Sequence, residues 1–222
     1  MQTIENLRRK QMFRALRWSL LLFAGFLIVT QQVVTYGPLV NIDNHIDRTH
    51  KPRFTGLAGF ALKKLDNLGL RGLTATVLII AAVFIAYKFK TWRPLNLAVL
   101  SLLGLNLIVG IFKLVLGRSK PRDGFDLFHA GGMSYPSGHA SNAVLSWGVL
   151  AYLIFRYAGV NKYRGRLAGL GVITVSLTVC TVSLIRQTHW FTDLLGGLFI
   201  GSALLVAVIA VDRYVPSKSQ LH

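Results

Sequence analysis

The stretch Tyr135-Pro136-Ser137-Gly138-His139 stands directly before an uncharged, apolar run that extends to Phe155. Proline favours positions at or just before a helix start, and Ser137 is a natural N-cap residue. The first turn of such a helix presents unpaired N–H groups and the positive end of the helix dipole, which together attract an anion such as phosphate. The pentapeptide therefore predicts a helix start with His139 beside a bound anion. A plain turn that leads into a membrane helix is the alternative.

The composition around this stretch is that of a membrane protein, because 53% of the 222 residues are hydrophobic and only 8 are acidic. Six uncharged runs approach the length that crosses a bilayer: 18–42, 72–87, 94–112, 140–155, 167–185 and 194–211. We expect an all-α integral membrane bundle of six transmembrane helices that forms one domain over residues 1–222. The basic N-terminal segment and first run resemble a signal peptide, but no clear cleavage site follows, which favours an uncleaved anchor.

The charge distribution predicts the orientation. Of the 25 Lys and Arg residues, 14 fall in the N-terminal segment, residues 88–93, residues 156–166 and the C-terminal segment, which alternating spans place on one face. The positive-inside rule makes this face cytoplasmic, with both termini there, in a cell membrane. The formal charge of +17 is then explained by topology and by anionic lipids, and nucleic-acid binding is not expected.

Three segments outside the spans receive their own predictions. Residues 1–17 form a basic cytoplasmic segment, and residues 40–71 contain an outer amphipathic segment that lies along the interface. Residues 117–135 form a Gly-rich, charged outer loop at the active site. The expected partners are a phosphorylated lipid and the bilayer; the sequence leaves the oligomeric state open.

Chemically useful side chains gather at the predicted outer face, although they come from three separate junctions between spans. Polar residues at membrane depth are costly and tend to be functional. His189 and Asp193 are four residues apart, so Asp193 can accept a proton from one ring nitrogen and leave the other free as a nucleophile. A metal pair or a simple polar contact explains this spacing equally well. The whole group is Lys113, the 117–135 loop, Ser137, His139, Arg186, His189 and Asp193.

A second histidine at an anion-binding helix start gives this group a chemical logic. One imidazole attacks phosphorus, and the other donates a proton to the leaving oxygen. Lys113, Lys120 and the N–H groups of the turn at Ser137–His139 then hold the charge of the phosphoryl group. A two-metal phosphatase needs several carboxylates, and the outer junctions near the histidines offer only Asp123, Asp126 and Asp193. The sequence therefore predicts no metal and no other cofactor.

Three blocks of this chain resemble the type-2 phosphatidic acid phosphatase family, whose members are membrane lipid phosphatases that share an active site with vanadium haloperoxidases and glucose-6-phosphatase. The family pattern is Lys-x6-Arg-Pro, Pro-Ser-Gly-His and Ser-Arg-x5-His-x3-Asp. The matching blocks here are Lys113-x6-Lys120-Pro121, Pro136-Ser137-Gly138-His139 and His189-x3-Asp193. The resemblance implies that His189 is the nucleophile, that His139 is the general acid and that Asp193 orients His189. It also implies phosphate binding by Lys113, Lys120, Ser137 and Gly138.

The chain departs from the family pattern at two cations. Lys120 replaces an arginine, which keeps the charge but loses the bidentate fork, and Arg118 or Arg122 is the candidate replacement for that geometry. The arginine of the third block falls at Ser183. Arg186 lies about one helical turn later and is expected to reach the same phosphate.

The resemblance implies hydrolysis of a lipid phosphate without metal, through a phosphohistidine, at the outer membrane face. Polyprenyl phosphates or diphosphates, phosphatidylglycerophosphate and phosphatidic acid are the candidate substrates. The alternatives are a phosphotransferase, in which a second lipid takes the phosphoryl group, and a non-catalytic membrane relative.

Overall fold

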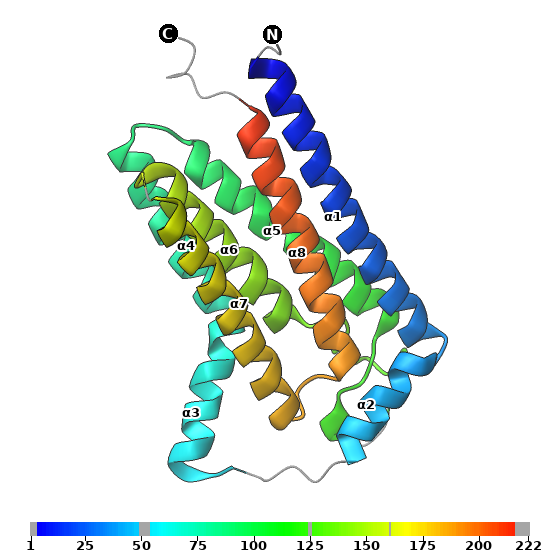
Figure 1. The fold of residues 1–222 in the computed structure, drawn as a ribbon. Coiled ribbons are helices and arrows are strands. Elements are labelled where there is room, and N and C mark those ends of the chain that lie inside the picture. Colours follow the sequence, from blue (N-terminus) through cyan, green and yellow to red (C-terminus); the bar gives the residue numbers. More distant parts are fainter. Residues whose placement is uncertain (1–3, 49–53, 124–125, 160, 216–222) are drawn as a thin grey trace.

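The helix that begins at the YPSGH stretch, α6 (Gly138–Tyr157), occupies the centre of the molecule. Its start is the one expected from the sequence, because Ser137 is the N-cap and its side chain accepts a hydrogen bond from the Ala140 N–H at 3.3 Å. Four long helices contact it: α4 (Arg71–Lys88), α5 (Arg93–Leu116), α7 (Lys162–Ile185) and α8 (Phe191–Tyr214) (Figure 1).

This computed structural model describes residues 4–48, 54–123, 126–159 and 161–215. The longest helix, α1 (Ile4–Val34), packs along the outside of α8, and both run the length of the bundle (Figure 1). It takes in most of the predicted basic segment at 1–17, so that segment continues into the first apolar helix without a break. The start of α1 and the end of α8 lie at one end of the bundle.

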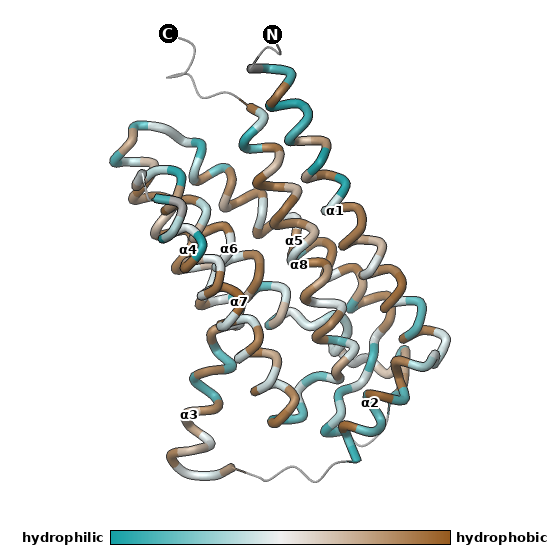
Figure 2. Tube along the Cα trace, viewed as in Figure 1, coloured by the Kyte–Doolittle hydropathy of each residue, from teal (hydrophilic) through white to brown (hydrophobic). Residues whose placement is uncertain are grey.

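Five helices in the described residues are long and apolar enough to cross a membrane, namely α1, α4, α5, α7 and α8. The all-helical membrane bundle is thus confirmed. The mean hydropathy of α6, however, is lower than expected for a sixth span. The reason is its buried face, which carries the polar residues Ser141, Asn142 and Ser146. Figure 2 shows hydrophobic residues along the long helices and hydrophilic ones at the start of α1 and in α2.

Close contact between α6 and α8 depends on glycines. A Cβ added to Gly197 would lie 2.6 Å from the Ser137 carbonyl oxygen, and one added to Gly201 would lie 2.8 Å from that of Ser141. Small residues let helix backbones approach where lipid supplies no hydrophobic driving force. This contact brings the starts of α6 and α8 together.

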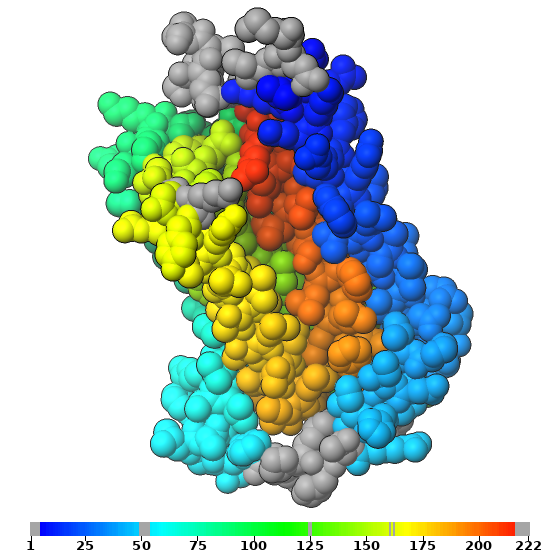
Figure 3. Space-filling model, in the orientation of Figure 1, coloured from blue at the N-terminus to red at the C-terminus, as the bar shows by residue number. Residues whose placement is uncertain are grey.

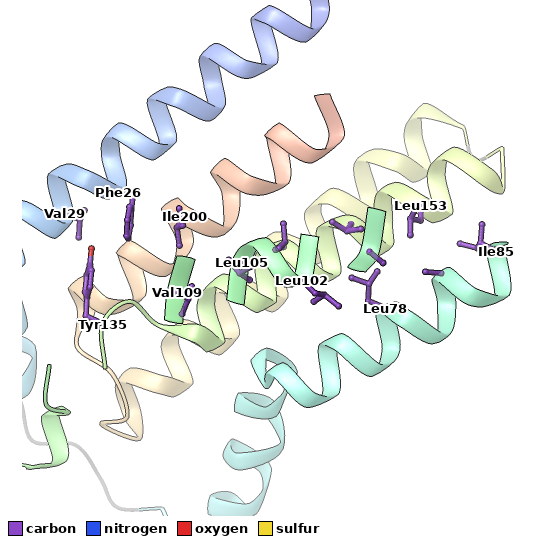
Figure 4. Packing of buried hydrophobic residues seen from close by; sticks show 14 of the residues in the cluster. Phe26, Val29, Leu78, Ile85, Leu102, Leu105, Val109, Tyr135, Leu153 and Ile200 are labelled. Atoms are coloured by element: carbon purple, nitrogen blue, oxygen red, sulfur yellow. The ribbon is translucent and has the colours of Figure 1, made fainter. Parts of the chain in front are cut away.

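A single apolar cluster joins the helices along the bundle. Figure 4 follows it from Phe26 on α1 through Leu105 on α5 to Leu78 on α4, with Tyr135 at the end nearest the α6 start. The Tyr135 hydroxyl is 2.7 Å from Thr30 Oγ1, so its polar end is paired despite burial.

The end of the bundle opposite the start of α1 carries two short helices, α2 (Pro38–Arg48) and α3 (Gly56–Asp66). The predicted amphipathic segment at 40–71 is therefore divided among α2, α3, the 3₁₀ turn η1 (Asn67–Gly69) and the start of α4. Leu57 and Phe60 of α3 are exposed, in keeping with a helix that lies on a lipid surface.

Candidate active site

The two predicted catalytic histidines lie next to each other, with ring centroids 6.1 Å apart and planes inclined by 57°. His139 occupies the first turn of α6, and His189 belongs to the short connection between α7 and α8. The two residues are 50 positions apart in the chain, and the close α6–α8 contact brings their rings together. Lys113, Arg186 and Asp66 are near enough for their charges to act on His139.

Asp193 lies beside His189. Its Oδ2 is 3.5 Å from Nδ1 of His189, a close polar contact that does not have the geometry of a hydrogen bond, and its side chain is fully buried. The same oxygen accepts bonds from the Ser134 hydroxyl and, at 2.9 Å, from the Trp190 backbone N–H. The carboxylate is thus fixed from several directions beside the Nδ1 edge of His189.

Arg118 lies behind Asp193 and is completely buried. Its guanidinium donates to Asp193 Oδ1 at 2.7 Å, to Asp43 Oδ2 at 2.9 Å and to both oxygens of Asp126 at 2.8 and 2.6 Å. A further bond reaches Thr192 Oγ1 at 2.8 Å. The sequence predicted Arg118 as a phosphate ligand; the structure instead uses its donors for three carboxylates and a hydroxyl, because it holds the loop, α2 and α8 together.

The loop between α5 and α6 folds back onto this arginine. The Ser134 N–H donates to the Arg118 carbonyl at 3.0 Å, and a Cβ on Gly132 would lie 2.2 Å from the same oxygen. The glycine at position 132 therefore serves the packing of the loop itself. Lys113 donates to the Met133 carbonyl from the other side.

The remaining predicted phosphate ligands differ in their placement. Lys113 lies beside the start of α6, since a Cβ on Gly138 would be 3.9 Å from its Cε, and it is close enough to Lys120 for their charges to interact. Lys120 is half-buried, whereas Arg122 is exposed on the 3₁₀ turn η2 (Pro121–Asp123). The Ser137 N–H is already used, because it donates to the Asp193 carbonyl at 2.9 Å.

Arg186 is the C-cap residue of α7. It pairs with Asp66 at the end of α3, and its side chain remains 30% exposed. The other oxygen of Asp66 accepts a hydrogen bond from Ser183 Oγ at 2.8 Å. The residue at the position of the family arginine and its predicted replacement therefore share one carboxylate.

A sequence profile of the PAP2 superfamily matches residues 94–216, which is more than half of the chain. The chain belongs to the PAP2 superfamily. The resemblance drawn from the three sequence blocks is thereby confirmed, and with it the enzyme class, a hydrolase that acts on lipid phosphates.

A curated protein and a solved structure, both from Bacillus subtilis, are similar to this PAP2-superfamily chain. Phosphatidylglycerophosphatase B of strain 168 is 27% identical over 154 residues, which are 68% of this chain and 73% of the relative. The crystal structure described as the first transmembrane PAP2 type phosphatidylglycerolphosphate phosphatase superposes with a TM-score of 0.79 at 22% identity. That superposition covers 90% of this chain and 98% of the other, so the fold is shared almost throughout.

Two carboxylates of the site were not predicted from sequence, Asp43 and Asp66, and both precede the part of the chain that matches the PAP2 superfamily. Asp43 of α2 accepts from the Thr192 N–H at 2.9 Å and so caps the start of α8. Burial raises the pKa of the Asp43 carboxyl, and the positive charge of Arg118 opposes that shift. The available signal was an acid three residues after Val40 on the face of α2 that becomes buried.

Proposed function

We propose that this PAP2-superfamily enzyme hydrolyses a phosphate monoester of a membrane lipid through a phosphohistidine intermediate at His189. The observation that carries the proposal is the approach of the His139 and His189 rings to 6.1 Å, with Lys113 and Arg186 near enough for their charges to act on His139. Phosphatidylglycerophosphate is the first substrate to test, because the similar proteins of B. subtilis carry that name. Polyprenyl phosphates and phosphatidic acid are the next.

In the first step, Nε2 of His189 attacks phosphorus and the bond to the lipid oxygen breaks. Asp193 accepts the hydrogen bond of the Nδ1 proton and stabilises the positive charge that the ring acquires. His139, protonated, gives its proton to the leaving oxygen, so the lipid departs as a neutral alcohol.

In the second step, water attacks the phosphohistidine and His139, now neutral, takes one of its protons. The N–P bond breaks, inorganic phosphate leaves, and both histidines return to their starting states. Lys113, Lys120 and Arg186 stabilise the charge on the phosphoryl oxygens through both steps.

The surrounding acids favour a mechanism without metal. A metal pair needs several free carboxylates, whereas Asp43, Asp126 and Asp193 are all bonded to Arg118. A guanidinium at their centre occupies the position that a cation would take.

A lipid substrate fits the surface below the site. A groove of about 730 Å³ between α6, α7 and α8 is lined mostly by apolar side chains and reaches Arg166 and Arg213 at its end away from the histidines (Figure 3). Its lining includes Val144, which lies between one and two helical turns from His139 on α6. Acyl or isoprenoid chains can lie in such a groove while the phosphate reaches the histidines.

We further propose that α6 crosses the membrane as the sixth span, enclosed by α4, α5, α7 and α8, which lets it carry polar residues on its buried face. With six spans both termini are cytoplasmic and the histidines lie at the outer face, as the distribution of Lys and Arg favours.

The test is phosphate release by the purified protein from micelles of phosphatidylglycerophosphate, phosphatidic acid and a polyprenyl phosphate, with and without EDTA. We expect release that persists in EDTA, is inhibited by vanadate, and falls about 10²- to 10⁴-fold in His139→Ala. Loss of phosphate from the substrate without free phosphate, in the presence of a second lipid, would identify a phosphotransferase. Full activity of His139→Ala would overturn the proposed acid.

A further inference from the structure

Asp66 is a buried acid at the edge of the site to which neither the family blocks nor the proposed chemistry gives a role. It is 4% exposed and ends α3, far from the matched superfamily region in sequence. One carboxylate oxygen accepts from Ser183 at 2.8 Å and the other pairs with Arg186. Its charge also acts on His139.

The segment that follows Asp66 is fixed against the active-site helix. The Trp147 indole N–H on α6 donates to the Leu68 carbonyl at 2.9 Å. Gly69 packs so tightly that a Cβ there would lie 2.6 Å from the His139 carbonyl oxygen. Asp66 thus directly precedes a turn whose backbone packs against His139 in the first turn of α6.

The presence of Ser183 at the position of the family arginine suggests a role for the Asp66 carboxylate. An arginine at 183 would stand two turns before His189, whereas Arg186 stands at the helix end, where its long side chain has more freedom. A serine at 183 and a carboxylate at 66 together form a fixed bracket, because Oδ1 is held by Ser183 while Oδ2 holds Nη1 of Arg186. The remaining N–H groups of the guanidinium can then face an oxyanion.

We propose that Asp66 is a positioning residue that holds Arg186 against the phosphoryl group, and so replaces the arginine that the family carries at position 183. The inference rests on the proposed function, since the ligand of Arg186 is the phosphate of the lipid substrate. Asp66 acts only through Arg186 and makes no contact with phosphate itself, because the carboxylate and the phosphate are both anions and repel each other.

The experiment is a double-mutant cycle of Asp66→Asn and Arg186→Ala, read out as KM, kcat and the inhibition constant of inorganic phosphate. Asp66→Asn retains the size of the side chain and an oxygen for Ser183. We expect either single variant to raise the phosphate inhibition constant about ten- to hundredfold, the range of one charge-assisted hydrogen bond. The double variant should lose no more than Arg186→Ala alone.

A relocated arginine tests the same idea without Asp66→Asn, should that variant fail to fold. In Ser183→Arg/Arg186→Ala the guanidinium returns to the family position, and we expect phosphate affinity within about threefold of the wild type. The matched control is Asp212→Asn, which removes a buried carboxylate bonded to Arg93 and Arg156 at the other end of the bundle. It should lower thermal stability and leave the phosphate inhibition constant unchanged.

Three results would overturn the proposal: an unchanged inhibition constant in Asp66→Asn, additive losses in the double variant, or no recovery in Ser183→Arg/Arg186→Ala. Binding of inorganic phosphate, measured by calorimetry on the solubilised protein, separates this proposal from the proposed function. Phosphate binding that depends on Asp66 in a protein that releases no phosphate from any lipid would contradict the function and leave the role of Asp66 standing.

Discussion

Two arginine–carboxylate clusters flank the paired histidines, and they are built in opposite ways. Arg118 is fully buried and donates to three carboxylates, whereas Arg186 is 30% exposed and has one carboxylate partner, Asp66, among the residues that the structure describes. A guanidinium with every donor engaged can only hold the protein together. One with donors to spare can bind substrate, so the number of partners, and not the proximity to the histidines, separates scaffold from ligand.

The difference also determines whether a substitution in each cluster mainly lowers the free energy of unfolding or mainly weakens substrate binding. Removing one partner from a buried ion-pair network leaves an uncompensated charge and costs about 3–5 kcal/mol. Removing a partly exposed arginine that has donors available for substrate should change the free energy of unfolding little and lower the affinity for substrate instead. The variants below use this contrast, beginning with the residue that stands between the two clusters.

His189→Asn should reduce phosphate release at least about 10⁴-fold, because the amide cannot act as the nucleophile that both clusters serve. The measurement is kcat/KM for a lipid phosphate at equal amounts of folded protein. The control is His129→Asn, an exposed histidine of the loop with φ of 55°, a conformation that asparagine tolerates. Equal losses in the two variants would remove His189 from the chemistry.

Arg118→Met should lower the free energy of unfolding by about 3–5 kcal/mol, because Asp43, Asp126 and Asp193 lose their common counterion. Denaturant unfolding in detergent micelles measures this. Arg122→Met is the matched control on the exposed turn η2, and a change within about 0.5 kcal/mol is expected there. If the two variants were equally stable, Arg118 would not be the scaffold residue described above.

Arg186→Ala should raise the KM for the lipid phosphate about ten- to hundredfold and change the unfolding free energy far less than Arg118→Met does. Ser183→Ala provides the comparison, since it removes one hydroxyl hydrogen bond to Asp66 and no cation. A loss in Arg186→Ala no greater than that in Ser183→Ala would show that Arg186 does not bind phosphate.

Lys120→Arg should have the smallest effect, a decrease in KM of about two- to fivefold, because it restores the bidentate fork of the family block at a half-buried position. Steady-state kinetics at fixed ionic strength measure it. A rise in KM would indicate that a neighbouring cation already supplies this geometry and that the larger head group is in its way.

The residues of the site that could be predicted from sequence are those whose roles depend on local spacing. Ser137 was expected at the N-cap and caps α6, and the matched blocks led to the PAP2 superfamily. The proximity of His189 and Asp193 follows from their closeness in sequence, because His189 directly precedes Trp190, the N-cap of α8, and Asp193 lies in the first turn of that helix. Such relations depend on a few neighbouring residues and need no long-range contact.

Asp43 and Asp66 depend on contacts that no local pattern records. Asp43 reaches Arg118 across 75 residues, and Asp66 reaches Ser183 across 117. The role of Arg118 was missed for the same reason. Its positive charge indicates only that it pairs with some anion, and the arrangement of α2 and α8 shows that these anions are carboxylates of the protein. The apolar level of α6 was overestimated because an uncharged run also contains Ser141, Asn142 and Ser146.

The transfer of the phosphoryl group to His189 is tested most directly by trapping it. Purified enzyme is mixed with a lipid substrate labelled in its phosphate, denatured in base to preserve phosphohistidine, and its peptides are examined by mass spectrometry. We predict label on His189 alone, and none in His189→Asn. Label on another residue, or turnover with no labelled peptide at any time, would contradict the covalent mechanism.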